Sequence, residues 1–154
     1  MELFVKEAIK RVGETFPFLI EETVADVEFD KRSLQFAKPV RVEGGYVFDG
    51  KAFSVFGRVD AELNSICARC NESFIEPVSF EFSERFVRSG AAFSDEDAYE
   101  YAGDRLEISR AVMDNLLLQL PIASVCKEDC CGLCRICGIN LNRERCSCEH
   151  ELAH

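Results

Sequence analysis

The sequence contains very little histidine. Its two histidines, His150 and His154, both lie within the last five residues of a 154-residue chain. Nucleophilic catalysis by a Ser-His or Cys-His pair needs a histidine in the body of the fold, so this class of enzyme is not expected. No glycine-rich phosphate-binding loop is present, and no spacing of Asp and Glu marks a catalytic pair. We therefore predict that the protein is not an enzyme and has no small-molecule substrate.

Long apolar runs and an excess of basic residues are also absent. No run approaches the ~18 residues of a membrane helix, and the first residues, MELFVKEAIKRVGE, hold no apolar block of a secretory signal. We expect a cytoplasmic protein with no membrane partner. With 18 basic and 28 acidic residues, the net charge is −10. Such a chain has no broad field that attracts phosphate, so contact with RNA requires a local basic patch or a basic protein partner.

Cysteine, in contrast, is abundant and concentrated at one end. The chain has nine cysteines, seven of them in the segment CKEDCCGLCRICGINLNRERCSC at residues 126–148. In a reducing compartment this density indicates metal ligands before disulfides. Cys134 and Cys137 form a C-x-x-C pair, and Cys146 and Cys148 form a second close pair. Four thiolates around one tetrahedral ion are typical of a structural zinc site with no open position for water or substrate.

The other cysteines fit a second site of the same kind. Cys126 and Cys130 remain as a pair in the tail, and Cys67 and Cys70 form a C-x-x-C pair that lacks a partner. We predict two structural Zn²⁺ ions, one for each group of four, with Cys131 left over. The adjacent cysteines leave open whether Cys130 or Cys131 is the ligand. The predicted metal ligands are Cys67, Cys70, Cys126, Cys130, Cys134, Cys137, Cys146 and Cys148.

Two other uses of the cysteines are alternatives to zinc. A thioredoxin-like redox role needs a C-x-x-C that opens a helix beside a βαβ unit, whereas a strand follows Cys70. An iron–sulfur electron carrier stays open, because thiolates alone do not exclude iron. The arginines and lysines between the cysteines would offset the charge of a four-thiolate zinc centre, but they are equally consistent with solvated surface charges.

The rest of the chain predicts an α+β fold rich in antiparallel strands. Residues 1–12 fit a short amphipathic helix or a strand over Leu3 and Val5. Short strands are expected between Thr15 and Phe48, with a turn at Gly44-Gly45. The clearest element is a long antiparallel hairpin, described next, and together these strands are expected to form a sheet or a partly open barrel.

Two runs of alternating apolar residues predict this hairpin. The first run covers Phe53–Leu63 and the second Phe74–Phe86, and each places its apolar residues on one parity. The Cys67–Cys70 motif then lies at or near the tip. Pro77, which has no N–H to donate, favours an edge position or a bulge in the second strand.

Three further segments complete the predicted domain. Residues 93–104, FSDEDAYEYAGD, are rich in acids and predict a solvated loop, with an acidic docking surface as the alternative. Leu106 and Ile108 fit one short strand. A core helix is expected at about residues 109–120, with Ser109 as N-cap. We thus predict a β-rich domain at residues 1–125 and, packed on it, a zinc-ribbon-like tail at residues 126–148.

These motifs resemble the YceD-type family of bacteria and plastids, the large ribosomal RNA subunit accumulation proteins. The resemblance covers roughly residues 50–148 and lies in three features: C-x-R-C after a long alternating strand, the segment LLLQLPIASVC, and the ending C-x3-C-x-GLC-x2-CG-x-NLN-x3-C-x-C. The chain departs from the family pattern at Cys131, where a basic residue is expected, and at Arg135, where proline is expected. The matching positions are the eight cysteines named above, framed by Gly132, Leu133, Gly138, Asn140, Leu141 and Asn142.

The resemblance implies a role in the synthesis, processing or stability of 23S rRNA during biogenesis of the large ribosomal subunit. It also implies a common gene neighbourhood with a zinc-containing large-subunit ribosomal protein. Our leading hypothesis is a non-enzymatic factor whose partners are the large-subunit precursor and a ribosomal protein, rRNA, or both, with the Arg143–Arg145 edge touching RNA. The alternative is a zinc-dependent protein-interaction adaptor or regulator unrelated to ribosomes.

Overall fold

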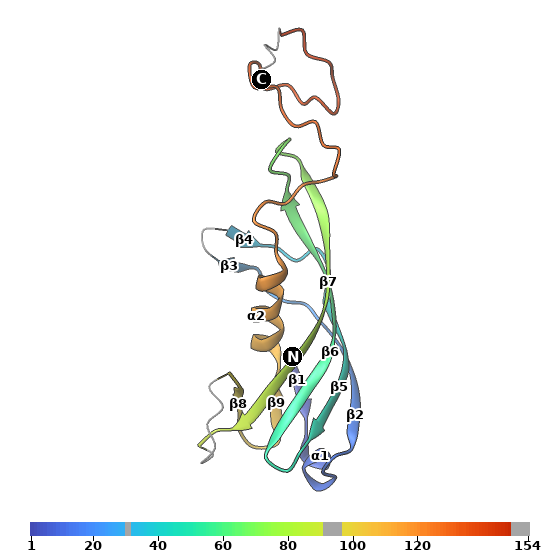
Figure 1. The fold of residues 1–154 in the computed structure, drawn as a ribbon, viewed down its shortest axis with the longest axis vertical. Helices are drawn as coiled ribbons and strands as arrows, with labels where there is room; N and C mark the ends of the chain where they lie inside the picture. Colours follow the sequence, from blue (N-terminus) through green and yellow to red (C-terminus); the bar gives the residue numbers. More distant parts are fainter. Residues whose placement is uncertain (30–31, 91–96, 149–154) are drawn as a thin grey trace.

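A computed structural model describes residues 1–29, 32–90 and 97–148 of the protein. This part of the chain is strand-rich with one main helix, which confirms the predicted α+β class (Figure 1). The elements are β1 (Glu2–Phe4), α1 (Lys6–Lys10), β2 (Thr15–Glu22), β3 (Val27–Phe29), β4 (Arg32–Leu34), β5 (Val40–Phe48), β6 (Ala52–Ile66), β7 (Ser73–Arg88), β8 (Tyr99–Tyr101), β9 (Arg105–Glu107) and α2 (Ser109–Gln119).

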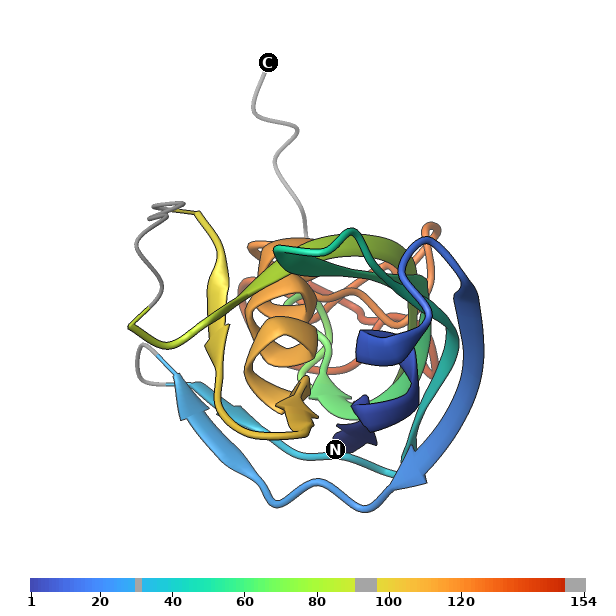
Figure 2. The same ribbon diagram turned by 90° about the horizontal axis from the view of Figure 1, so that it is seen from below.

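The main sheet has the strand order β2-β5-β6-β7-β8. Its pairs are antiparallel except β7 with β8, which is parallel. Two small antiparallel pairs, β1 with β9 and β3 with β4, lie beside it. Seen from below, the sheet curves around α2 and the N-terminal segment (Figure 2). The sheet is open, because β2 and β8 end its strand order without pairing to each other.

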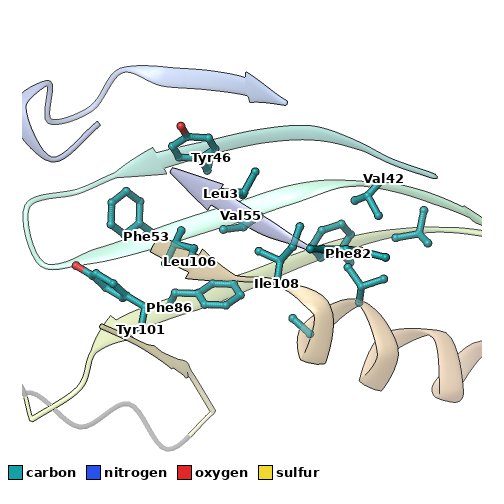
Figure 3. Close-up of a cluster of buried hydrophobic side chains, with 14 of the residues drawn as sticks. Leu3, Val42, Tyr46, Phe53, Val55, Phe82, Phe86, Tyr101, Leu106 and Ile108 are labelled. Atoms are coloured by element: carbon teal, nitrogen blue, oxygen red, sulfur yellow. The ribbon is translucent and has the colours of Figure 1, made fainter. Parts of the chain in front are cut away.

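The hydrophobic core lies between the concave face of the sheet and α2. The predicted inward residues of β6, such as Phe53, Val55 and Val59, are fully buried, and α2 contributes Val112 and Leu116 (Figure 3). Burying one such aliphatic or aromatic side chain contributes roughly 1.5–3 kcal/mol. The alternation predicted from the sequence is therefore confirmed, and α2 is a core helix. No helix in the described part of the chain is long and apolar enough to cross a membrane.

The long hairpin is confirmed, with β6 and β7 paired from Ala52 and Val87 up to Ile66 and Ser73. Its upper part extends beyond the other strands of the sheet (Figure 1). Pro77 lies opposite Glu62, whose carbonyl accepts a bond from Ala37 on the side away from β7. Pro77 and Glu62 therefore form a non-hydrogen-bonded pair, in which the backbone N–H and C=O groups of each residue point away from the partner strand. On that side of β7, β8 pairs only with residues 86–88. Pro77 therefore occupies an edge position and removes no ladder bond.

The turn predicted at Gly44-Gly45 is wrong, because both residues lie inside β5. Gly44 is paired with Gly57 of β6, and a Cβ on Gly44 would lie 2.6 Å from the Cα of Gly57. The backbones of β5 and β6 approach so closely that a side chain does not fit between them. Gly44 and Gly57 allow this close backbone contact, and Gly44 does not change the direction of the chain.

The acidic loop predicted at 93–104 is partly corrected. Residues 93–96 lie outside the described residues, but Tyr99–Tyr101 forms β8. The ring of Tyr99 stacks on Phe86 at 5.4 Å between centroids, and Tyr101 meets Phe53 edge-on at 5.3 Å. Burial of the aromatic ring of Tyr101 outweighs the acidic surroundings of this short strand.

The N-terminal segment contains both of the predicted alternatives. Leu3 lies in β1 and is buried, and Val5 immediately precedes α1. The predicted N-cap of the main helix is shifted by one residue, since Ile108 occupies the cap position and Ser109 is the first helical residue. The Ser109 hydroxyl accepts a bond from the Met1 amino group at 2.7 Å, so it is engaged outside its own helix.

Candidate metal centres

The C-x-x-C motif forms a tight turn at the tip of the β6–β7 hairpin. The N–H of Cys67 donates to the carbonyl of Glu72 at 2.9 Å, and the N–H of Asn71 donates to the carbonyl of Cys67 at 2.8 Å. Asn71 has φ of 59°, a left-handed conformation that asparagine tolerates better than most residues. The turn therefore holds the two sulfurs of Cys67 and Cys70 at the end of a long, rigid arm.

Backbone hydrogen bonds attach the tail to this tip. The N–H of Ala68 donates to the carbonyl of Ser124 at 2.8 Å, and the N–H of Leu133 donates to the carbonyl of Arg69 at 3.1 Å. The Arg69 guanidinium donates to the carbonyl of Glu128 at 2.8 Å. At Gly132, with φ of +74°, a Cβ would lie 3.0 Å from the Arg69 carbonyl oxygen. Glycine is thus required both for the turn and for this close approach.

Four cysteine sulfurs meet where the tail joins the tip, and we call them the inner cluster: Cys67, Cys70, Cys126 and Cys130. The Sγ atoms of Cys67 and Cys130 are 3.8 Å apart, as are those of Cys70 and Cys126. A tetrahedral zinc with bonds of about 2.3 Å requires sulfur separations of about 3.8 Å. Three of the four cysteines are buried, and Phe74 of β7 packs against them.

The outer cluster comprises the last four candidate ligands, Cys134, Cys137, Cys146 and Cys148, whose sulfurs lie within 4.8 Å of one another. It belongs entirely to the C-terminal segment, which extends beyond the hairpin tip in Figure 1. The Sγ of Cys134 accepts bonds from the N–H groups of Ile136 and Cys137 at 3.4 and 3.5 Å. The outer cluster is less buried, and Cys137 is exposed.

The electrostatics of both clusters suit a bound cation. The backbone N–H groups of Cys126, Cys70 and Arg69 lower the pKa of Cys67 to about 6. Those of Cys137 and Ile136 lower the pKa of Cys134 to about 6. Burial raises the pKa of Cys126 to about 12, and the thiols of Cys137 and Cys146 raise that of Cys148 to about 12. Four thiols so close together cannot all ionise to thiolates without a compensating positive charge. The donor set therefore fits a divalent metal that binds thiolates.

The structure separates the two adjacent cysteines. Cys130 lies with the inner cluster, whereas Cys131 is exposed and its Sγ donates to the carbonyl of Asp129 at 3.6 Å. Asn142 contributes to this separation, since its Nδ2 donates to the Sγ of Cys130 at 3.3 Å and its Oδ1 accepts from the N–H of Cys131 at 2.9 Å. The sequence indicated Asn142 only as part of the family frame.

Some basic residues of the tail and the hairpin tip bind protein groups, and others face solvent. Arg143 forms an ion pair with Glu72, with 2.7 Å between Nη2 and Oε1, and so links the outer segment to the hairpin turn. Arg69 binds backbone carbonyls of the tail, a role that its position between two cysteines did not reveal. Arg135 and Arg145 are exposed. That these eight cysteines bind metal stays a prediction at this point.

Comparison with known proteins relates the chain to relatives that are longer. An uncharacterized protein of Mycobacterium tuberculosis is 30% identical over 94 residues, covering 58% of this chain and 45% of that protein. One of Mycobacterium leprae is 31% identical over 91 residues, covering 56% and 42%. The chain thus spans less than half the length of these curated relatives. No solved structure matches the chain.

Two further matches carry a family name. A protein of Arabidopsis thaliana named "Large ribosomal RNA subunit accumulation protein YCED homolog 1, chloroplastic" is 37% identical over 46 residues, which are 30% of this chain and 14% of that protein. The family described as "Large ribosomal RNA subunit accumulation protein YceD" matches residues 55–154, a range that includes most of the hairpin and both cysteine clusters. The chain belongs to the YceD family of large ribosomal RNA subunit accumulation proteins.

Proposed function

We propose that the protein is a non-enzymatic factor that supports the synthesis, processing or stability of 23S rRNA during biogenesis of the large ribosomal subunit. The observation that carries this proposal is the family match over residues 55–154. The printed name of the Arabidopsis relative links that protein to the accumulation of large-subunit ribosomal RNA. The proposal includes a cytoplasmic location, because the proposed partners of the protein are ribosomal precursors.

The proposal includes two structural Zn²⁺ ions, one held by the inner cluster and one by the outer cluster. A bound zinc would offset part of the charge of its four thiolates and crosslink the segments that carry the ligands. Four sulfurs complete a tetrahedral shell and leave no position for a reacting water, which favours a structural role over a catalytic one. The division into a β-rich domain at residues 1–125 and a zinc-binding tail at residues 126–148 is proposed on the same basis.

Charge supports a division of labour between the two parts. Residues 126–148 contain four basic and three acidic side chains, whereas the whole chain has 18 basic and 28 acidic ones. The acidic body suits contact with a basic ribosomal protein. In the tail, the basic side chains offset part of the negative charge of the proposed zinc centres, so an RNA contact there depends on individual exposed arginines. Within the proposed Arg143–Arg145 edge, Arg143 is engaged by Glu72, so exposed Arg145 is the better candidate for an RNA contact.

Sedimentation of ribosomal particles tests the proposed function. The protein should co-migrate with precursors of the large subunit, and its loss should lower 23S rRNA relative to 16S rRNA. The proposal fails if the protein never co-migrates with these precursors and 23S rRNA is unchanged. A pull-down after RNase treatment then examines the adaptor alternative, which a partner set without ribosomal proteins would favour.

Metal analysis of the purified full-length chain tests the metal assignment separately. Two zinc ions per chain are expected, and a content of one or none contradicts the two-site proposal. If anaerobically purified protein contains iron and shows visible charge-transfer absorbance, the clusters hold an iron–sulfur centre and the zinc assignment is wrong.

A further inference from the structure

A groove of about 530 Å³ lies beside the inner cluster, outside both cysteine sites. It is bordered by β4, the upper part of the β6–β7 hairpin and residues 120–124, which follow the C-terminal end of α2. These segments converge below the hairpin tip in Figure 1. Leu34 and Leu63 are the buried apolar residues of its lining, and two exposed isoleucines, Ile66 and Ile122, also line it. The volume is within the usual range of roughly 300–1,000 Å³ for binding pockets.

The groove is connected to the inner cluster through its walls. Ala68 and Ser124 both line it, and the N–H of Ala68 donates to the Ser124 carbonyl at 2.8 Å. Ala68 lies between the ligand candidates Cys67 and Cys70, and Ser124 lies two residues before Cys126. A metal that joins these cysteines therefore also fixes two sides of the groove in place.

The chemistry of the lining selects the class of occupant. Glu76 is the only charged residue among the described residues that line the groove, and Ser65 donates to its carboxylate at 2.6 Å. Among the described lining residues a phosphate backbone finds no cation, and this carboxylate repels it. A second copy of the chain brings the same net charge of −10, which opposes self-association. A cationic side chain beside aliphatic ones matches both the carboxylate and the isoleucines.

We propose that this groove binds an extended, basic segment of a large-subunit ribosomal protein, with aliphatic side chains over Ile66 and Ile122 and a Lys or Arg facing Glu76. This inference rests on the proposed function for the identity of the partner. In an extended segment, side chains two positions apart share one face, so an aliphatic and a basic side chain can both face the groove. A metal at the inner cluster would support the walls of the groove without being part of the contact.

Site-specific photo-crosslinking tests the inference. A photoreactive amino acid replaces Ala123, an exposed residue of the groove, in the zinc-loaded full chain. The probe is the RNA-free protein fraction of purified large subunits, and crosslinked peptides are identified by mass spectrometry. Crosslinks are expected at peptide segments that carry Lys or Arg within a few residues of the crosslinked position.

Matched variants make the test specific. Glu76→Lys and Ile122→Asp should each lower the crosslinking yield by about tenfold, because each removes one part of the complementarity. Leu118→Asp makes the same apolar-to-acidic change on α2 outside the groove and should leave the yield unchanged. Ile122 and Leu118 are 90% and 81% exposed, so neither change disturbs the core. Unchanged zinc content and circular dichroism verify the fold of each variant.

Three outcomes would overturn the inference: crosslinks only to a second copy of the chain, crosslinks to rRNA in place of protein when intact subunits are used, or yields that neither groove variant alters. If co-migration with large-subunit precursors persists in such a case, the proposed function stands and only the groove assignment fails. Absence of co-migration for the unmodified protein, together with unchanged 23S rRNA, is a failure of the proposed function itself.

Discussion

Asn142 shows how one side chain decides which of two neighbouring cysteines faces the inner cluster. It donates to the sulfur of Cys130 and accepts from the backbone N–H of Cys131, so the two residues are held in opposite directions. It also donates to the Oδ1 of Asn140 at 2.9 Å, which fixes its own orientation. A hydrogen bond of this kind orients a thiolate toward a metal and stabilises its charge.

Replacing Asn142→Ala should weaken zinc binding at the inner cluster by about 10- to 100-fold, the usual cost of removing a group that orients a metal ligand. Competition with a chromogenic chelator measures this affinity. Asn64→Ala, an exposed asparagine of β6, serves as the control and should bind zinc normally. Equal affinities of the two variants would show that Asn142 does not support the site.

Gly44 illustrates a residue whose role comes from backbone packing. Gly44→Ala should lower the free energy of unfolding by about 1–3 kcal/mol, because the new methyl group meets the backbone of β6. Gly45→Ala is the matched control: its Cβ would meet only side chains, at 3.1 Å, and these can move. Urea denaturation of both variants measures the difference. An equal loss of stability in the two would contradict the close-packing explanation.

Among the elements, the β6–β7 hairpin acts as an arm that carries half of the inner cluster. Its cysteines contact tail residues that are 56 and 63 positions away in the sequence. The outer cluster, by contrast, is contained within residues 134–148 and joins no distant element. Loss of metal from the two proposed sites should therefore release different parts of the chain.

Cys130→Ala should lose the inner metal and detach the whole tail from the hairpin, so that limited proteolysis cuts near residues 120–126. Cys148→Ala should lose only the outer metal and leave the junction at the tip protected. Cys131→Ala is the control and should keep both metals, because its sulfur lies outside the clusters. Metal counting with peptide mapping distinguishes these patterns, and identical cleavage of the first two variants would contradict the hierarchy.

On the scale of the whole molecule, the described residues form two separate buried clusters. The larger one joins the sheet, α2 and the N-terminal segment and contains no cysteine. The smaller one consists of inner-cluster cysteines with Phe74 packed against them. The body is thus stabilised by apolar burial and the tip by its sulfur contacts, and the two parts depend on different physical interactions.

Chelation of the metals should therefore unfold the tail and leave the body folded. Hydrogen exchange is expected to become fast in residues 126–148 and near the hairpin tip, while the lower half of β6 and β7 stays protected. Adding zinc should restore the protection. Loss of protection throughout the sheet on chelation would show that the body depends on the metals, contrary to the separation of the two clusters.

The sequence by itself determined the features that depend on local periodicity and spacing. Alternation over Phe53–Leu63 and Phe74–Phe86 was sufficient to predict the hairpin, because side chains of a strand alternate between its two faces. The spacing of the cysteine pairs indicated which of them would meet, because a C-x-x-C turn brings two sulfurs together. The family motif lies in the same short segments.

Only the tertiary structure decided features that depend on contacts between distant segments. The role of Gly44 required the position of Gly57 on β6, and β8 required the rings of Phe53 and Phe86 as packing partners. Which of Cys130 and Cys131 faces the inner cluster depended on Asn142. The groove depended on three segments that converge below the hairpin tip. Residue spacing along the chain does not predict such contacts, because they form when separate elements pack against one another.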